Sequence, residues 1–200
     1  MADHSTHASM LSRLRDLDDH ASWSQFDDRY RDLILRYCRR KGLQQCDAED
    51  VRQIVMLNLA KQLRTFQYDA SKGRFRDYLG MVVRNAIFRL FRSPNAKLAG
   101  LETSVEDELV ADPDLTLDTM WEEEWMASHY RRALSSVRKD SDAKSVEAFE
   151  MLLEGSDLDE VAAHFGMRRD AVQKVKQRMR DRLKAAVAAQ VAEEEGLSES

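Results

Sequence analysis

Apolar residues in the first part of the chain recur at the three- and four-residue spacing of amphipathic helices. The first stripe lies between positions 24 and 42 and consists of Phe26, Tyr30, Leu33, Ile34, Tyr37 and Cys38. Gly42 is expected to end that helix. A second helix is predicted over 48–63, with Asp47 as its N-cap and Asp50 three residues later in a capping box.

A third helix is predicted over 75–92, after a loop over 65–74. Its buried stripe consists of Phe75, Leu79, Val82, Val83, Ala86 and Leu90. Phe88 and Phe91 fall near the opposite side of this helix, among arginines. Two interpretations stay open for these rings. They are exposed and stack on nucleic-acid bases, or they pack against an N-terminal helix.

The second half of the chain repeats the helical pattern with shorter segments. Periodicity resumes over 117–137, where Trp121 and Trp125 share one side, and a further helix is predicted over 145–153. A short helix, a turn at Gly166 and a longer basic helix over 168–188 follow. The inward stripe of the last helix consists of Val172, Val175, Met179 and Leu183. The pattern therefore predicts an all-α protein.

Composition agrees with this fold class and divides the chain. The 200 residues include only 7 glycines and 2 prolines, which is too few for the turns of an all-β fold. Both prolines lie in 94–114, which is predicted to be a linker. The expected organisation is a polar segment, a first domain, a linker, a second domain and an acidic tail, over 1–22, 23–93, 94–115, 116–190 and 191–200. With no apolar run of membrane length and no signal peptide, we expect a cytoplasmic protein without membrane insertion.

The charge of the chain changes sign along its length. Residues 1–97 carry 18 Lys and Arg against 12 Asp and Glu, whereas 98–130 carry no Lys or Arg and 10 acids. Residues 131–200 are nearly balanced, with 13 basic and 14 acidic residues. The formal net charge of −5 thus hides basic regions on both sides of an acidic segment.

Candidate metal ligands and nucleophiles are few. Cys38 is predicted to be a buried thiol and Cys46 to lie in a turn, and neither belongs to a Cys/His cluster. Ordinary surface or helix positions are expected for the scattered histidines, which are His4, His7, His20, His129 and His164. A metal-dependent hydrolase built on Asp47, Glu49 and Asp50 would need further ligands, and capping explains Asp47 better. We therefore expect no enzyme, no metal and no cofactor.

The last two predicted helices have the features of a helix-turn-helix that reads duplex DNA. Ala162 or Ala163 supplies the small residue where the helices cross, and Gly166 supplies the turn. The outward face of the second helix consists of Arg168, Arg169, Gln173, Lys174, Gln177 and Arg178. Such side chains contact guanine, adenine or phosphate. The alternative is an amphipathic surface helix whose basic face is only solvated.

Three blocks of the chain carry a resemblance to a known family. The first is the sequence DAEDVRQ at 47–53, the second is F-x-Y-D-x-S-K-G-R-F-R-D-Y-L at 66–79 followed by V-R-N at 83–85, and the third is the helix-turn-helix. In this order they resemble regions 2.2, 2.3–2.4 and 4.2 of an extracytoplasmic-function (ECF) sigma factor, a bacterial transcription initiation factor. Ile54 stands where that family has glutamate, and Tyr78 where it has tryptophan.

The resemblance implies a function for each part of the chain. Sigma region 2 would lie at 23–93 and region 4 at 116–190. Asp50, Arg52 and Gln53, exposed on one helix, would dock on the β′ clamp of core RNA polymerase, and the β flap would be a second contact. The minus-10 promoter strand would be held by Lys72, Arg74, Arg84, Asn85 and Arg89. The helix-turn-helix would read the minus-35 duplex. Whether an anti-sigma factor also binds is left open.

A second reading of the same blocks is a helix-turn-helix regulator that never docks on polymerase. In that case residues 24–93 would form a sensor or dimerisation domain. The basic stretch 65–92 favours the sigma factor, because a sensor domain does not need it.

Overall fold

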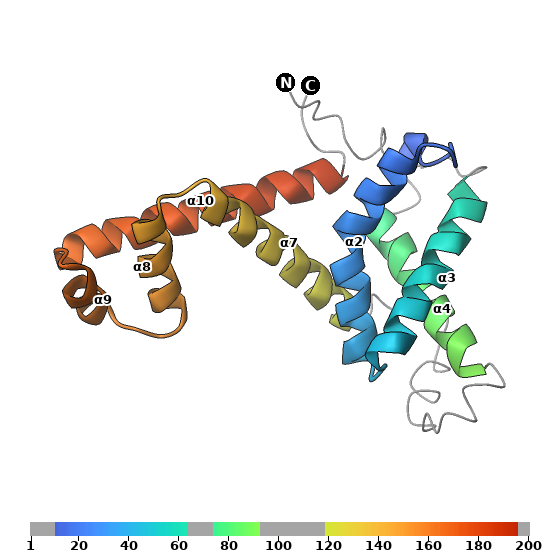
Figure 1. Cartoon of the computed structure of the whole chain (residues 1–200), viewed down its shortest axis with the longest axis horizontal. Coiled ribbons are helices and arrows are strands. Elements are labelled where there is room, and N and C mark those ends of the chain that lie inside the picture. Colours follow the sequence, from blue (N-terminus) through green and yellow to red (C-terminus); the bar gives the residue numbers. More distant parts are fainter. Residues whose placement is uncertain (1–10, 64–73, 93–118, 196–200) are drawn as a thin grey trace. The chain divides into compact units, whose positions relative to one another are not determined.

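A computed structural model of the chain describes residues 11–63, 74–92 and 119–195 (Figure 1). Within these ranges the chain forms helices and no strand, which confirms the all-α prediction. The chain divides into two compact units, Met1–Met126 and Ala127–Ser200. Among the described helices, none combines the length and the apolar composition that a membrane crossing requires.

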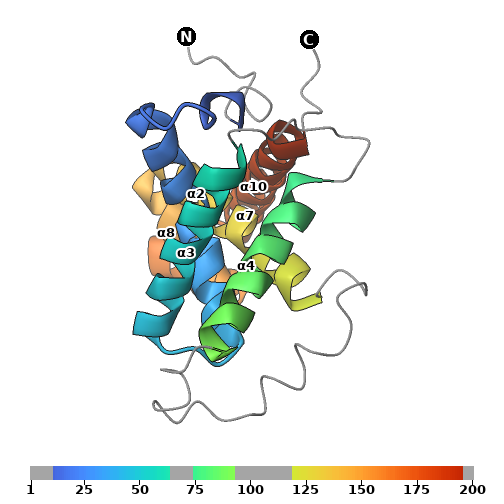
Figure 2. The ribbon, with the colours of Figure 1, turned by 90° about the vertical axis from the view of Figure 1, so that its right-hand side faces the viewer.

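The first unit is built around three helices, α2 (His20–Arg40), α3 (Gln45–Leu63) and α4 (Phe75–Arg92). α3 packs against both α2 and α4 (Figure 2). α2 begins four residues earlier than the apolar stripe suggests, because Asp19 caps it by accepting a hydrogen bond from the Ser22 amide at 3.0 Å. Gly42 follows the helix at φ 88°, as expected for its stop.

The start of α3 differs from the prediction. The Ala48 amide donates to the Gln44 carbonyl at 2.9 Å, so helical hydrogen bonding begins ahead of the expected N-cap. Asp47 therefore lies in the first turn of α3, where its charge favours the positive end of the helix dipole. The predicted capping box of Asp47 and Asp50 is wrong, and Cys46 lies on the helix, exposed, rather than in a turn.

α4 has the predicted bounds, and its buried stripe is wider than expected. Most of the predicted stripe is buried, but Leu90 is only half-buried, while Ile87 and Phe91 join the core. Buried positions four residues apart advance about 40° around a helix at each step, so a stripe that begins at Phe75 reaches Phe91. Phe91 is 8% exposed and Phe88 half-buried, so the interpretation of both as exposed stacking rings is wrong.

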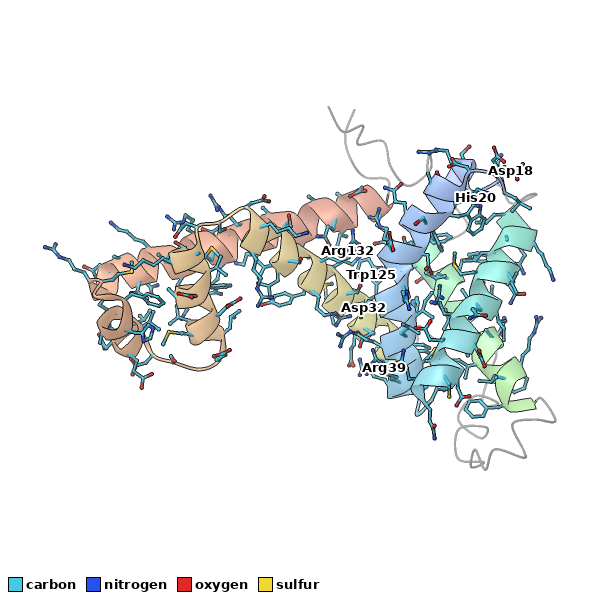
Figure 3. All side chains as sticks on the ribbon, in the orientation of Figure 1. Asp18, His20, Asp32, Arg39, Trp125 and Arg132 are labelled. Carbon is cyan, nitrogen blue, oxygen red and sulfur yellow. The ribbon has the colours of Figure 1, made fainter. Side chains whose placement is uncertain are left out.

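The next helix, α7 (Thr119–Lys139), crosses the division between the units. Its residues 119–126 belong to the first unit, although we expected all of 116–190 in the second domain. Trp121 and Trp125 are both buried, and the Trp121 ring meets the Tyr37 ring edge-on at 5.1 Å between centroids. Trp125 lies where α7 meets α2 (Figure 3). These two tryptophans explain why the first unit extends beyond α4.

The second unit contains residues 127–139 of α7 together with α8 (Ala143–Leu153), α9 (Leu158–Phe165) and α10 (Arg169–Glu195). Asp157 and Glu160 form a capping box at the start of α9. Gly166 ends α9 in the left-handed conformation at φ 62°, as the sequence indicated. α10 runs seven residues past its predicted end at 188.

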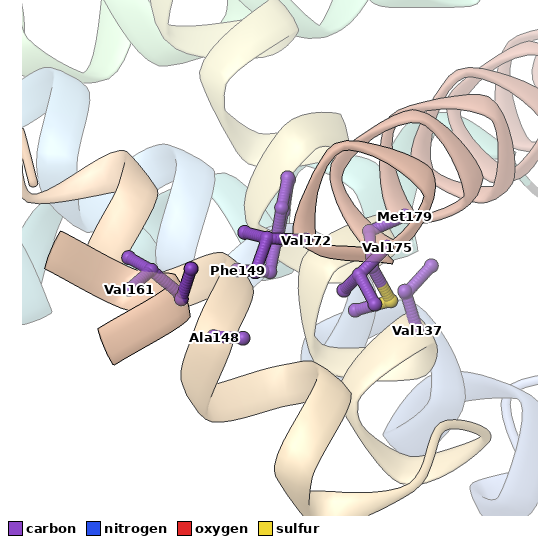
Figure 4. Packing of buried hydrophobic residues seen from close by; sticks show 8 residues of the cluster. Val137, Ala148, Phe149, Val161, Val172, Val175 and Met179 are labelled. Carbon is purple, nitrogen blue, oxygen red and sulfur yellow. The ribbon is translucent and has the colours of Figure 1, made fainter. Parts of the chain in front are cut away.

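A core of valine, alanine and methionine side chains around one phenylalanine holds the second unit together (Figure 4). Its buried members are Val137, Ala148, Phe149, Val161, Ala162, Val172, Val175 and Met179. All four residues of the inward stripe predicted for α10 are buried. His129 lies on α7, so of the two expected positions it has the helix one; it is buried, with Nε2 2.6 Å from a Glu194 carboxylate oxygen.

Candidate functional site

Arg52 joins α2 to α3 and is not part of an exposed face. Its Nη1 donates to Asp27 at 2.6 Å, its Nε donates to Glu49 at 2.8 Å, and its side chain is 17% exposed. Arg31 donates to the other Glu49 oxygen at 2.9 Å. Hydrogen bonds from Arg52 and then Arg31 lower the pKa of Glu49. The expectation that Arg52 is exposed is therefore wrong, because two carboxylates hold its guanidinium between helices, while its role in docking stays a prediction.

The exposed face of α3 contains the other two predicted docking residues. Asp50 and Gln53 are exposed, and Leu57 follows one turn after Gln53 with 61% of its surface exposed. Ile54, half-buried, lies beside them. Leu57 is not among the predicted docking residues, although the buried positions of α3 at intervals of four residues leave it outside the stripe. This face can offer a protein partner both polar and apolar contacts.

Arg74 and Arg76 stand at the start of α4 among carboxylates. Arg74 Nε donates to Asp77 at 3.0 Å. Arg76 Nη2 lies 3.1 Å from Glu122, and its guanidinium stacks over the Trp125 ring at 4.3 Å. The Arg76 side chain is only 11% exposed. The predicted strand-binding arginine, Arg74, thus already has an acidic partner, and Lys72 lies outside the described residues.

The remaining predicted minus-10 residues occupy the later turns of α4. Arg84 is half-buried, whereas Asn85 and Arg89 are exposed one turn apart, and exposed Met81 precedes them on the same face. From Arg74 to Arg89 the set extends over about 22 Å of helix axis. Such a length suits an extended strand better than a small ligand.

Tyr78 links α4 to α3 at the position where the resembled family has tryptophan. Its hydroxyl donates to Gln62 Oε1 on α3. Burial raises the pKa of Tyr78, so the phenol keeps its proton and remains a donor at neutral pH. Tyr78 therefore stabilises the helix pair that carries the candidate residues.

The predicted outward face of α10 is exposed at every position, as the sequence indicated. Its residues are Arg168, Arg169, Gln173, Lys174, Gln177 and Arg178. Several of them already have internal partners. Arg169 pairs with Asp159 at 3.2 Å, and Gln177 donates to Asp181 at 2.8 Å.

Arg178 reaches from α10 to the start of α8. Its Nη2 donates to Ser145 Oγ at 2.7 Å and lies 3.8 Å from Asp142. Hydrogen bonds from Ser145, followed by the charge of Arg178, lower the pKa of Asp142. Arg178 and Lys174 line one hollow of about 360 Å³ with the α8 start. The outward cations thus border a concave surface between α8 and α10.

A second, larger hollow of about 510 Å³ lies on a different face of α10. Its lining is Tyr130, Phe149, Leu152, Leu153, Lys176, Arg180, Leu183, Lys184, Val187 and Ala188. Leu153 and Tyr130 are 49% and 40% exposed, so large apolar side chains face solvent there. This apolar groove is not predictable from the periodicity of any one helix, because its walls come from three different helices.

No metal centre is found in the part of the chain that the structure describes, where no three His, Cys, Asp or Glu side chains gather in a suitable group. Glu49, considered above as a ligand, is engaged by Arg31 and Arg52. Cys38 is buried, and burial raises the pKa of its thiol to about 12, which confirms the buried thiol.

Residues 26–96 match the family model of sigma-70 region 2. The match contains all of α3 and α4 and most of α2, and it ends before α7. This match supports a relationship to sigma-70 for the part of the chain that it covers, and with it a role in transcription initiation. The comparisons with curated proteins and with solved structures found no match for the chain.

Proposed function

We propose that the chain is a sigma factor of the ECF type, which binds core RNA polymerase, recognises minus-10 and minus-35 elements and assists promoter melting. The observation that carries the proposal is the region 2 match over residues 26–96. A second observation supports it. Later in the sequence, the second unit contains a short helix, a glycine turn and a helix with an exposed basic face, in the order that region 4 requires.

In this proposal the β′ clamp docks on the exposed α3 face of Asp50, Gln53 and Leu57. A leucine with 61% of its surface in solvent, flanked by polar side chains, is suited to the apolar centre of a protein interface. Arg52 acts as a positioning residue, because its bonds to Asp27 and Glu49 orient α3 on α2.

The minus-10 strand would follow the exposed face of α4. Arg84 and Arg89 would neutralise phosphates, and Asn85 between them has the donor and acceptor groups to contact a base edge. Capturing an unstacked base costs a few kcal/mol, which contacts in a pocket offset. Arg74 and Lys72 would contribute from the loop over 65–74 and its junction with α4.

The minus-35 duplex would receive α10 in its major groove. Gln173 and Lys174 are exposed on its first turns, where recognition helices contact base edges. Arg178, held by Ser145 at 2.7 Å, would contact DNA from the border of the hollow between α8 and α10.

The apolar groove of the second unit supports a protein contact there as well, and we assign it to the β flap. Apolar side chains such as Leu153 and Val187 form most of its wall, which suits the apolar face of a helix rather than nucleic acid. Lys176, Arg180 and Lys184 border it and would favour acidic residues on that partner helix.

Co-purification of the full chain with core RNA polymerase, followed by run-off transcription, tests the proposal. The variant D50A/Q53A should lower the affinity for core enzyme at least about tenfold, since it removes two central polar contacts. The matched control is Q25A/D28A, which makes the same two changes at the same spacing on exposed positions of α2. This control should bind as the unchanged chain does.

Unchanged binding of D50A/Q53A would refute the α3 docking face. If the unchanged chain binds duplex DNA but never core polymerase, the chain is instead a regulator that acts without polymerase docking. Arg52 is unsuitable for this test, because its replacement would also disturb the packing of α2 and α3.

A further inference from the structure

The first eight residues of α7 form an acidic segment between aromatic anchors. This acidic segment, residues 119–126, contains the sequence W-E-E-E-W and no Lys or Arg. It packs with the first unit, where α4 carries the residues proposed above for the minus-10 strand. The acidic segment and a nucleic-acid strand are therefore both anionic partners for the same unit.

Trp121 anchors the acidic segment to α2 and α4. Its ring is 3% exposed, and its Nε1 donates to the Arg76 carbonyl at 3.0 Å. Gly80 on α4 leaves the space that the ring occupies, since a Cβ at that position would lie 2.8 Å from Trp121 Nε1. The fit of the ring against a glycine places the following glutamate at a defined point on α4.

Glu122 is held over the two arginines at the start of α4. One carboxylate oxygen lies 3.1 Å from Arg76 Nη2, and the other lies 4.0 Å from Arg74 Nη2. The Arg76 side chain lies between Glu122 and the Trp125 ring, and only 11% of its surface is exposed. A phosphate cannot reach the Arg76 guanidinium while the carboxylate and the ring cover it.

The next two glutamates point to a different cation. Glu123 lies 2.7 Å from Arg40 Nη2, and Glu124 lies 3.5 Å from Arg40 Nη1, at the end of α2. Glu122 pairs with the arginines at the start of α4, whereas Glu123 pairs with Arg40. The chain thus contains two neighbouring glutamates that differ in their partner but not in their charge.

We propose that the acidic segment is an internal competitor of the minus-10 strand: Glu122 occupies Arg74 and Arg76 in place of a strand phosphate. This inference rests on the proposed function and adds Arg76 to the residues that contact the strand once the acidic segment is displaced. Single-stranded DNA and the acidic segment then exclude each other at the start of α4, so the chain alone binds the strand more weakly than its basic charge allows.

Binding of the full chain to a short fluorescent single-stranded oligonucleotide, at low and at moderate salt, tests the competition. E122Q removes the competing charge and should raise the affinity roughly threefold or more at low salt. E123Q is the matched control, since it changes the net charge equally one residue away and weakens only the hold on Arg40, which Glu124 still pairs. It should raise the affinity clearly less than E122Q does.

A second variant displaces the acidic segment without changing any charge. G80A places a methyl group against the Trp121 ring, so it should shift the tryptophan emission and raise the strand affinity in the same direction as E122Q. In an R74Q background the gain from E122Q should shrink, because one of the two released arginines is missing.

Equal affinities of E122Q and E123Q would overturn the inference. So would a G80A chain with shifted emission and unchanged affinity. Absence of strand binding by every variant would overturn it as well. Co-purification with core polymerase reports on the proposed function separately, so a normal result there with a failed competition test would refute the inference alone.

Discussion

The arginines that lie beside the candidate binding faces differ in exposure between the two units. In the first unit, Arg52 and Arg76 are 17% and 11% exposed and are held by carboxylates from other parts of the chain. In the second unit, Arg169 and Arg178 are 64% and 51% exposed and border a hollow surface or solvent. Carboxylates of the chain therefore cover the guanidinium groups of Arg52 and Arg76, whereas Arg169 and Arg178 are open to a ligand without a rearrangement of the chain.

The hydrophobic cores of the two units differ as well. Large rings fill the first unit, where Phe26 lies 4.6 Å from Tyr30 and 6.0 Å from Phe75 between centroids. The second unit relies on valine, alanine and methionine around one phenylalanine. A single truncation should therefore remove more buried surface from the first unit than from the second.

Trp121→Ala should produce the largest effect on this comparison. It should lower the free energy of unfolding of the first unit by about 3–5 kcal/mol, because a buried ring and its hydrogen bond to the Arg76 carbonyl are lost. All three tryptophans precede residue 127, so tryptophan emission reports the first unit, whereas circular dichroism reports both. In urea, the emission transition should move to lower concentration, while the part of the circular-dichroism change that comes from the second unit stays at the same concentration. A shift of both transitions together would contradict separate units.

Arg52→Met should cost roughly 1–3 kcal/mol of first-unit stability, since it leaves Asp27 and Glu49 without their shared cation. Arg169→Met, which breaks an exposed pair in the second unit, should change stability by less than about 0.5 kcal/mol. Urea unfolding of both variants compares the two uses of arginine directly. Equal losses would show that burial does not separate them.

Arg178→Ala should weaken binding to a preferred minus-35 duplex by roughly 1–3 kcal/mol and reduce discrimination at one base pair, if Arg178 contacts a guanine edge. A phosphate contact would instead weaken all sequences equally and lower the salt slope by about one unit. The measurement is affinity for single-base duplex variants at two salt concentrations. Unchanged affinity with lower stability would place Arg178 with Arg52, as a residue that holds helices together through Ser145.

The smallest expected effect is on how much folding stability each unit loses at acidic pH. The pKa of Glu49 is lowered in the folded chain, so the unfolded chain binds more protons at acidic pH, and stability falls as the pH drops below about 4.5. Glu49→Gln should reduce that fall in the emission transition. Asp142→Asn should act likewise on the second unit, where the pKa of Asp142 is also lowered. The check is urea unfolding at pH 6 and pH 3, and an unaltered pH dependence in both variants would contradict it.

The local pattern of apolar residues and glycines determined where several helices lie, where they end and which side of each is buried. The spacing of Phe26, Tyr30 and Leu33 predicts α2, and that of Val172, Val175 and Met179 predicts α10 and its buried side. Gly42 and Gly166 mark helix ends, since both need a positive φ that other residues adopt at a cost. Exposure of the outward face of α10 follows from the same periodicity, so that candidate face was predictable.

Only the tertiary structure decided which charged side chains belong to the fold. Arg52 meets Asp27 across 25 positions of sequence, and Trp121 meets Arg76 across 45. The burial of His129 against Glu194 likewise depends on α7 and α10, which are far apart in the sequence and meet in the fold. Periodicity states which side of a helix is apolar, but not which distant group neutralises a charge beside that stripe. Burying such a charge is favourable only with a partner at hydrogen-bond distance, and that partner is brought there by the packing of whole helices.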